Sequence, residues 1–209
     1  MSDAAAHWRS VYARKDPALV SWYEPEPTRS LALIESAHLA PDAAILDMGG
    51  GTASLAARLV ASGHTDVTVA DISSAALERA RAGSASVADR ITWIQADVRA
   101  HTFARRYELW HDRAVFHFMV AAENREGYLE VLRRTLRPDG HLILATFGPE
   151  GPERCSGLPV VRYDAPGIAA CLGAEFTLIY SGLQTHRTPS GASQQFLYAH
   201  FVRKPRRTP

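Results

Sequence analysis

Three consecutive glycines near residue 50 follow an acidic residue. Asp47 precedes Gly49, Gly50 and Gly51 in the stretch ILDMGGGTASLAARL, which has the pattern of a strand, a turn and the start of a helix. Glycine lets a backbone approach a ligand closely, and a carboxylate accepts hydrogen bonds from hydroxyl, ammonium or amino groups. The stretch therefore predicts a ligand-binding loop with one carboxylate beside it.

Two further carboxylates follow apolar runs of the same kind. Asp71 ends VTVAD and is followed by Ile72, and Asp97 ends WIQAD and is followed by Val98. Open parallel sheets bind ligands at the carboxyl ends of their strands, so side chains that end neighbouring strands meet there. Three carboxylates at three strand ends are hard to explain as packing, and they indicate one polar binding site.

The stretch YELWHDRAVFHFM, residues 107–119, carries a second group of candidates. It passes from an apolar strand pattern to His111, Asp112 and His117. A histidine exchanges a proton near neutral pH and a carboxylate can orient a substrate, so these three are candidate catalytic residues. Other interpretations stay open: His111 can be a satisfied strand-end histidine, and Asp112 and Arg113 can form a local ion pair of small energetic value.

Six residues are candidate substrate contacts. They come from the proline-punctuated segment DPALVSWYEPEP, from the end of the fourth strand pattern and from GPERCSGLPVVRY after the fifth. The candidates are Trp22, Tyr23, Arg113, Cys155, Arg162 and Tyr163. Aromatic anchoring of the N-terminus, core packing, a local ion pair and surface exposure are the alternatives for them. Cys155 and the histidines match no known zinc-ligand spacing, so we predict no metal site.

Strand and helix patterns alternate through the chain. Apolar strand patterns cover residues 43–48, 66–71, 91–97, 107–112, 141–147, 174–187 and 193–204, and helix patterns lie between most of them. Such alternation implies right-handed crossovers and a parallel sheet covered on both faces. The last two strand patterns are joined by TPSGA, a hairpin signal. We predict one Rossmann-like α/β domain with a seven-stranded, mostly parallel sheet, an antiparallel last strand and helices on both faces.

The two ends of the chain differ from this core. Helix patterns over residues 5–15 and 28–39 predict an N-terminal helical cap, residues 1–40, that covers the site on a core of residues 41–209. The last residues, 203–209, are basic and contain proline, which predicts a flexible, solvated tail. No domain boundary is predicted.

Composition restricts the partners. The chain has 209 residues, 46% of them hydrophobic and 22% charged, with a formal net charge of +1. So small a net charge does not favour binding to a nucleic acid or to a membrane surface. No apolar run approaches the roughly 18 residues of a membrane span. Two cysteines and the lack of a signal-peptide pattern predict a cytoplasmic protein. We expect a monomer or a homodimer.

The glycine loop has two possible interpretations, which differ in the cofactor that it would bind. A dinucleotide-binding fingerprint needs a third glycine to pack its helix, and Ser54 stands there. From Ile45 to Val202 the chain instead resembles the class I S-adenosylmethionine-dependent methyltransferases. The shared features are an acidic residue before the glycines, one at the end of each of the next two strands, and an antiparallel end to the sheet. The resemblance implies S-adenosyl-L-methionine as cofactor and S-adenosyl-L-homocysteine as product.

The resemblance also implies where the cofactor would lie. Its methionine end would lie against Asp47 and the three glycines, its ribose hydroxyls would bind Asp71, and its adenine amino group would bind Asp97. Ile72 and Val98 would lie beside the adenine. Each assignment gives a carboxylate to a group that donates hydrogen bonds.

The acceptor is less determined than the cofactor. The resemblance places the loop after the fourth strand beneath the transferable methyl group, and we favour transfer to a sulfur, nitrogen or oxygen atom of a small molecule. HWRSVYARK followed by WYEP is similar to the N-terminal module of small protein-lysine methyltransferases. Asp112 matches the first acidic residue of their substrate motif, but His117 stands where the second would be. Protein lysine methylation is therefore the alternative, and a non-catalytic cofactor-binding protein is the third hypothesis.

Overall fold

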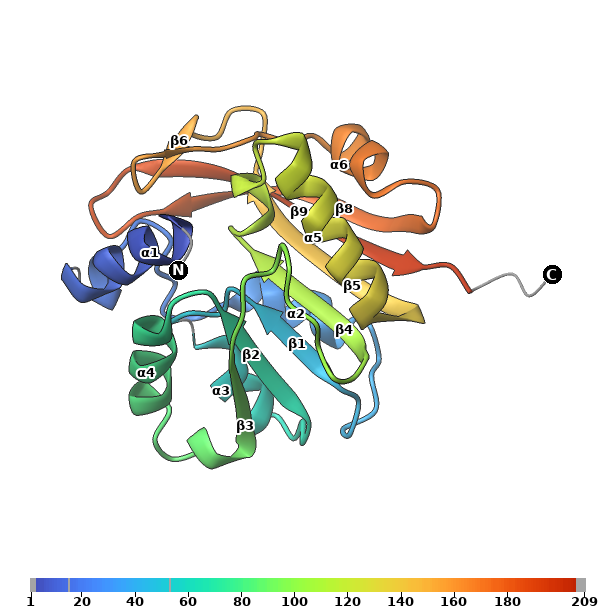
Figure 1. The fold of residues 1–209 in the computed structure, drawn as a ribbon, viewed down its shortest axis with the longest axis horizontal. Helices are drawn as coiled ribbons and strands as arrows, with labels where there is room; N and C mark the ends of the chain where they lie inside the picture. The colour runs from blue at the N-terminus through green and yellow to red at the C-terminus, as the bar shows by residue number, and fades with distance from the viewer. Residues whose placement is uncertain (1–2, 15, 53, 206–209) are drawn as a thin grey trace.

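The core of the structure is a seven-stranded sheet (Figure 1). The computed structural model describes residues 3–14, 16–52 and 54–205. Along the sheet the strands follow the order β3-β2-β1-β4-β5-β9-β8. Their bounds are β1 Ile45–Met48, β2 Val67–Asp71, β3 Ile91–Gln95, β4 Tyr107–Arg113, β5 Leu136–Phe147, β8 Phe176–Arg187 and β9 Ser193–Arg203. The number and arrangement of the strands confirm the predicted fold class.

Strand direction changes only at the C-terminal end of the sheet. β1 pairs in parallel with β2 and β4, β2 pairs in parallel with β3, and β4 pairs in parallel with β5. β9 is antiparallel to both of its neighbours, β5 and β8. β8 and β9 form the hairpin predicted from TPSGA, because so short a turn joins only antiparallel neighbours.

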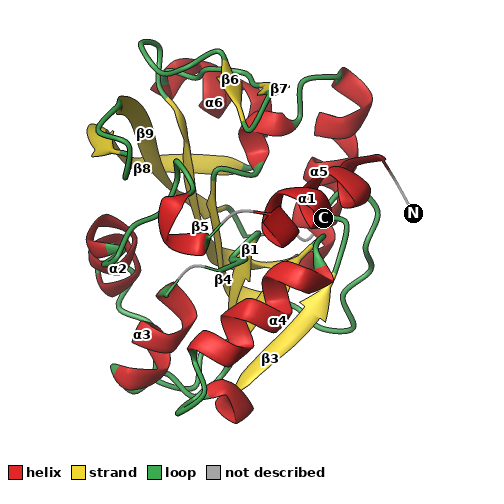
Figure 2. Cartoon of the chain, turned by 90° about the vertical axis from the view of Figure 1, so that its left-hand side faces the viewer, coloured by secondary structure: helices red, strands yellow, loops and turns green. Residues whose placement is uncertain are grey.

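Helices cover both faces of the sheet, as predicted (Figure 2). On one face lie α2 (Thr28–Glu35), α3 (Leu55–Ala61) and α4 (Ser74–Gly83), and on the other lie α5 (Ala122–Thr135) and α6 (Ala165–Leu172). Successive side chains of a strand point to opposite faces. In β4, Leu109 is therefore buried in the cluster of the first face, whereas Trp110 is buried in the cluster of the second.

The two predicted N-terminal helices pack in different places. α1 (Asp3–Arg14) contacts α4, whereas α2 contacts α3 and β5. The buried residues Leu33 and Ile34 make α2 part of the core on its face of the sheet. The expectation that both helices cover the cofactor stays a prediction, and α2 reaches the strand ends through Ser30, which lines a cavity together with Asp47 and Gly50.

The predicted C-terminal tail begins later than expected. Arg203 is the last residue of β9, and its side chain is buried. Its guanidinium donates to the carbonyl oxygens of Arg133 and Leu136, at 2.6 Å each, and pairs with Glu175 at 3.2 Å. Arg203 was wrongly assigned to the tail, because a basic residue at a chain end looks solvated when its long-range partners are unknown. Residues 206–209 lie outside the described part of the chain.

Arg203→Ala removes these contacts from the end of β9. We expect it to lower the free energy of unfolding by about 2 kcal/mol, since it leaves two buried carbonyl oxygens without a charged donor. Urea unfolding measures the change, and Lys204→Ala on the exposed neighbour is the matched control. Equal stabilities of the two variants would show that Arg203 behaves as a tail residue.

Candidate active site

A cavity of approximately 440 Å³ lies at the carboxyl ends of the first four strands. Its walls come from α1, Trp22, the loops after β1 and β4, and the ends of β2 and β3. The remaining wall is a small hairpin, β6 (Arg154–Cys155) and β7 (Leu158–Pro159), which the sequence did not predict. The volume is within the ~300–1,000 Å³ range of small-molecule and cofactor sites. A second cavity of approximately 50 Å³ shares Tyr12, Trp22 and Arg113 with it.

The structure brings the predicted cofactor residues together at this edge of the sheet. The residues of this set that line the larger cavity are Gly49, Asp71, Ile72, Asp97 and Val98. Asp47 and Gly50 line the smaller cavity. Gly51 lies close to both Asp71 and Tyr12.

Two glycines of the loop cannot be replaced without strain. Gly49 has a φ of +71° and Gly51 a φ of +45°. A Cβ on Gly49 would lie 2.0 Å from Cγ2 of Val115. A Cβ on Gly51 would lie 2.8 Å from Oη of Tyr12 and 3.1 Å from Oδ2 of Asp71. Both positions therefore need glycine, for its conformation and for the close approach of other residues.

The chain turns sharply after β4. Ala114 has a φ of +69°, a left-handed conformation that is uncommon for a residue with a Cβ. Its N–H donates to the carbonyl oxygen of Ala145 at 2.8 Å, which holds the turn against β5. The turn places Val115 against Gly49, and Ala114 and Val115 both line the larger cavity.

Asp47 is held by a histidine from the neighbouring strand. Asp47 and His111 are paired in the register of β1 and β4, and Nδ1 of His111 lies 2.8 Å from Oδ1 of Asp47. Nε2 of His111 lies 2.9 Å from the hydroxyl of Ser30 in α2. Both ring nitrogens are thus engaged, and His111 lines the smaller cavity together with Asp47, so its catalytic role stays a prediction. Oδ2 of Asp47 is buried and has no hydrogen-bond partner in the described part of the chain.

Asp71 is a buried carboxylate at the end of β2. Its Oδ1 accepts a hydrogen bond from the backbone N–H of Ser73 at 2.8 Å. Burial, with a smaller contribution from the charge of Asp47, raises the pKa of Asp71 to about 7. Burial and the charge of Asp71 also raise the pKa of the nearby Tyr12 hydroxyl, which therefore stays protonated.

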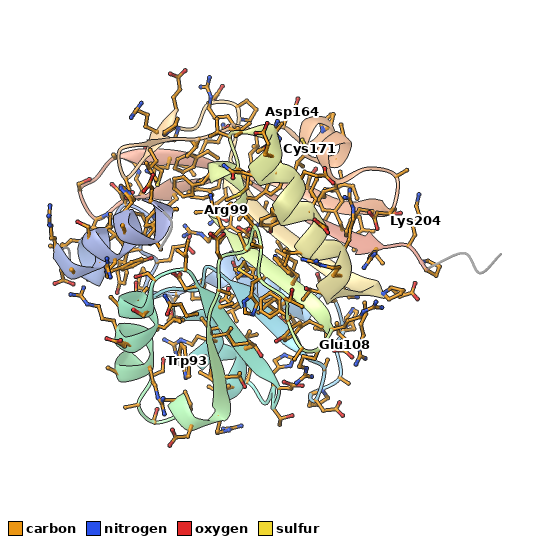
Figure 3. All side chains as sticks on the ribbon, in the orientation of Figure 1. Trp93, Arg99, Glu108, Asp164, Cys171 and Lys204 are labelled. Atoms are coloured by element: carbon orange, nitrogen blue, oxygen red, sulfur yellow. The ribbon has the colours of Figure 1, made fainter. Side chains whose placement is uncertain are left out.

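Asp97 is paired with Arg99, a residue that was not predicted at the site. Nε and Nη2 of Arg99 lie 2.8 Å and 2.5 Å from the two carboxylate oxygens of Asp97, and Nη1 lies 3.3 Å from Oδ1 of Asn124. Arg99, labelled in Figure 3, follows β3, and all three residues line the larger cavity. A partner of Asp97 must therefore share its carboxylate with Arg99.

Asp112 does not reach either cavity. Its side chain is fully buried, and its oxygens accept from the N–H groups of Val115 and Phe116 and from the hydroxyl of Tyr128 at 2.7 Å. Burial raises its pKa to about 6 despite these donors. The structure does not bring Asp112 to the cavities: as the neighbour of His111 in a strand it points to the opposite face, where it holds the turn after β4.

His117 is also buried away from the cavities. Its Nδ1 lies 3.3 Å from the backbone N of Phe147, and its ring packs against Phe118 and Phe147. Burial, with a smaller contribution from the charge of Arg113, lowers its pKa to about 3, so the ring is neutral. The structure does not bring the predicted base His117 to the cavities, because the short helix that carries it turns the ring into the core.

The six predicted substrate contacts divide between the cavities and the rest of the molecule. Trp22, Arg113 and Cys155 line the larger cavity, and Tyr23 lines only the smaller one. Arg162 is exposed and pairs with Glu153, and Tyr163 is buried in the core against Phe116. The structure does not bring Arg162 and Tyr163 to the cavities, because the chain between β7 and α6 carries them away.

An aromatic wall closes the larger cavity on the side of α1. Trp8 and Tyr12 of α1, Trp22 and Phe118 all line the cavity. The ring centroid of Trp8 lies 5.8 Å from that of Trp22 and 5.1 Å from that of Phe118. Trp8 and Tyr12 were not predicted at the site, although their separation of four residues places both on one face of a helix.

The described residues hold no cluster of three or more His, Cys, Asp or Glu side chains that could bind a metal ion. Cys155 takes part in no disulfide. Within the same part of the chain, none of the helices combines the length and the apolar character that a membrane crossing requires.

Asp112→Ala tests the structural role of this buried carboxylate. We expect it to lower the free energy of unfolding by about 2–4 kcal/mol, because two backbone N–H groups and a tyrosine hydroxyl lose their acceptor. Urea unfolding measures the change. Asp89→Ala is the matched control, since that side chain is 92% exposed. A loss no greater than that of the control would return Asp112 to the list of candidate catalytic residues.

Comparison with known proteins agrees with the geometry of the site. Residues 45–140 match the family described as a methyltransferase domain. No curated protein matches the chain.

Solved structures share the fold over nearly the whole chain. A SAM-dependent methyltransferase from Anabaena variabilis is 16% identical, with a TM-score of 0.76 over 98% of this chain and 96% of that one. The N-methyltransferase NodS from Bradyrhizobium japonicum, with bound S-adenosyl-L-homocysteine, is 17% identical, with a TM-score of 0.72 over 96% and 99%. A Burkholderia thailandensis 1,6-didemethyltoxoflavin-N1-methyltransferase is 21% identical, with a TM-score of 0.68 over 97% and 89%.

At these identities the structures show likeness of fold. The family match covers the first strand to the start of the fifth, which includes the glycine loop and the acidic residues of the site. Residues 45–140 therefore resemble a methyltransferase domain, and the sheet as a whole has the fold of solved SAM-dependent methyltransferases.

Proposed function

We propose that the protein transfers the methyl group of S-adenosylmethionine to a sulfur, nitrogen or oxygen atom of a small molecule. The observation that carries the proposal is the larger cavity. It runs from Asp71 and Asp97 at the strand ends to the aromatic wall of Trp8, Trp22 and Phe118, so one space can hold a cofactor and a small acceptor side by side.

The polar groups of the site fit the cofactor at three points. The unpaired Oδ2 of Asp47 suits an ammonium group, and the buried carboxylate of Asp71 suits a pair of ribose hydroxyls. Asp97 suits the amino group of the adenine while Arg99 holds it in place. Gly51 has no Cβ, and a Cβ at this position would meet Asp71. The ribose would therefore lie against backbone atoms of the glycine loop.

The contribution of the protein to methyl transfer is alignment and exclusion of water. The sulfonium of the cofactor is already a good leaving group, so positioned reactants need little further activation. The acceptor side is walled by the aromatic residues and by Leu158 and Pro159 of the β6–β7 hairpin. These apolar walls remove water from the reacting atoms. Neither His111 nor His117 faces this space, so we assign neither a role in proton transfer.

Two observations favour a small acceptor over a protein lysine. A lysine side chain entering from a protein would need a carboxylate to hold its ammonium, and the matching position holds the buried, neutral His117. The acceptor side of the cavity is apolar, with Cys155 among its walls. Among the fold relatives, one is named for a small heterocycle and another is a glycopeptide N-methyltransferase, MtfA.

Cofactor binding should weaken in acid because of Asp71. With its pKa raised to about 7, the carboxylate is ionised above pH 7 and protonated below it. If only the ionised form accepts from both ribose hydroxyls, the affinity for S-adenosyl-L-homocysteine should fall about tenfold from pH 8 to pH 6. Isothermal titration calorimetry at each pH measures this.

Asp71→Asn should bind weakly and with little dependence on pH. Asp89→Asn, at an exposed carboxylate, should keep the wild-type pH profile. An affinity of the wild-type protein that does not change between pH 6 and pH 8 would contradict the assignment of Asp71 to the ribose.

The acceptor class can be tested without knowing the acceptor. The protein is incubated with methyl-labelled S-adenosylmethionine and a cell lysate separated into small-molecule and protein fractions. We expect label in the small-molecule fraction, and none with Asp71→Ala. Label confined to the protein fraction would favour lysine methylation, and label in neither fraction would favour a cofactor-binding protein without turnover.

A further inference from the structure

A buried chain of polar side chains crosses one face of the sheet. It runs from Asp47 through His111, Ser30 and Tyr198 to Arg113. Four of these residues are at most 3% exposed, and the side chain of Arg113 is 11% exposed. The separations are 2.8 Å from Asp47 to His111, 2.9 Å from His111 to Ser30 and 3.1 Å from Tyr198 to Arg113. The side chains of Tyr198 and Ser30 also interact, and this interaction joins the two parts of the chain.

The two hydroxyls of this chain lie between partners on either side. Arg113 can only donate, so the hydroxyl of Tyr198 accepts from it. The hydroxyl of Ser30 shares a hydrogen bond with Nε2 of His111, and Nδ1 of His111 shares one with Asp47. Removing one hydroxyl therefore disturbs the partners on both of its sides.

Arg113 anchors the segment that carries Trp22. Its Nη1 donates to the carbonyl oxygen of Trp22 at 2.8 Å, and its Nη2 pairs with Glu24 at 2.9 Å. The guanidinium lies 4.7 Å from the ring centroid of Phe196. A planar guanidinium makes several such contacts at once, and an ammonium does not. With its donors directed to the protein, Arg113 holds a wall of the cavity more readily than it holds a substrate.

A histidine of β8 holds the same segment from another side. Nε2 of His186 lies 2.8 Å from the carbonyl oxygen of Ser21, and its Nδ1 lies 3.6 Å from Glu24. Trp22 lines both cavities, and its ring centroid lies 6.2 Å from that of Tyr12. Residues 20–24, here called the Trp22 segment, are thus fixed to the sheet through the backbone carbonyls of Ser21 and Trp22 and through the side chain of Glu24.

We propose that Arg113 and Tyr198 are positioning residues that tie the placement of Trp22 to cofactor binding at Asp47. The inference rests on the proposed function, which puts the ammonium of the cofactor beside the unpaired Oδ2 of Asp47. A cation bound there fixes the carboxylate and, through it, His111 and the rest of the chain. The wall of the acceptor space is then most ordered when the cofactor is present, which favours acceptor binding after the cofactor.

Hydrogen exchange of the Trp22 segment tests the proposal with S-adenosyl-L-homocysteine as the probe. In the wild-type protein, the probe should slow the exchange of backbone amides in residues 20–24 by about tenfold. Tyr198→Phe removes one hydroxyl from the middle of the chain. It should reduce this slowing to less than about threefold while changing the dissociation constant of the probe, measured by calorimetry, by less than about threefold.

Tyr107→Phe is the matched control, since it removes the hydroxyl of another buried tyrosine, which interacts with Thr68 away from the chain. It should keep the wild-type response. Arg113→Lys, which keeps the charge but not the planar fork, should lose the response as Tyr198→Phe does. If circular dichroism shows that Tyr198→Phe does not fold, Arg113→Lys replaces it in the test. A wild-type response in both variants overturns the proposal.

Failure of the proposed function gives a different result. A wild-type protein that does not bind S-adenosyl-L-homocysteine at all overturns both the proposed function and the coupling to the cofactor. A wild-type protein that binds the probe, but whose Trp22 segment exchanges at the same rate with and without it, overturns the coupling alone.

Discussion

The two-residue period of β4 decides which polar side chains can reach the site. His111 and Arg113 share the face on which Asp47 lies, whereas Asp112 between them points towards α5. On one face of the sheet, β4 therefore contributes His111 and Arg113 to the buried polar chain. On the opposite face it contributes Asp112, whose carboxylate accepts the hydrogen bonds that hold the turn after β4. The glycine loop depends on both, because His111 holds Asp47 and the turn brings Val115 against Gly49.

Much of the fold could be predicted because its signals are local. Apolar runs alternate with helix patterns, and the turn TPSGA joins the last two strands, which together determine the sheet and its antiparallel end. The carboxylates Asp71 and Asp97 could be placed for the same reason, since each closes an apolar run. Their arrival at one cavity follows from the parallel direction of the strands.

What could not be predicted depends on contacts between distant parts of the chain. The wall of the cavity joins Trp8 and Trp22 to Phe118, about a hundred residues away, and no local pattern indicates that meeting. His111 and Asp112 were assigned to one site although neighbours in a strand face opposite ways. That error was avoidable from the sequence. The burial of His117 could not be predicted from the sequence, because it depends on the short helix after the strand and on Phe147 of β5.

The contact between Val115 and Gly49 has a consequence for engineering. The side chain of Val115 contacts Gly49 and also lines the larger cavity. The same residue therefore influences both the volume of the cavity and the shape of the glycine loop. A smaller residue at 115 would widen the cavity but remove the support of the loop. Changes that aim to broaden the range of acceptors are better made at Leu158 or Pro159, on the β6–β7 hairpin, where the wall is independent of the loop.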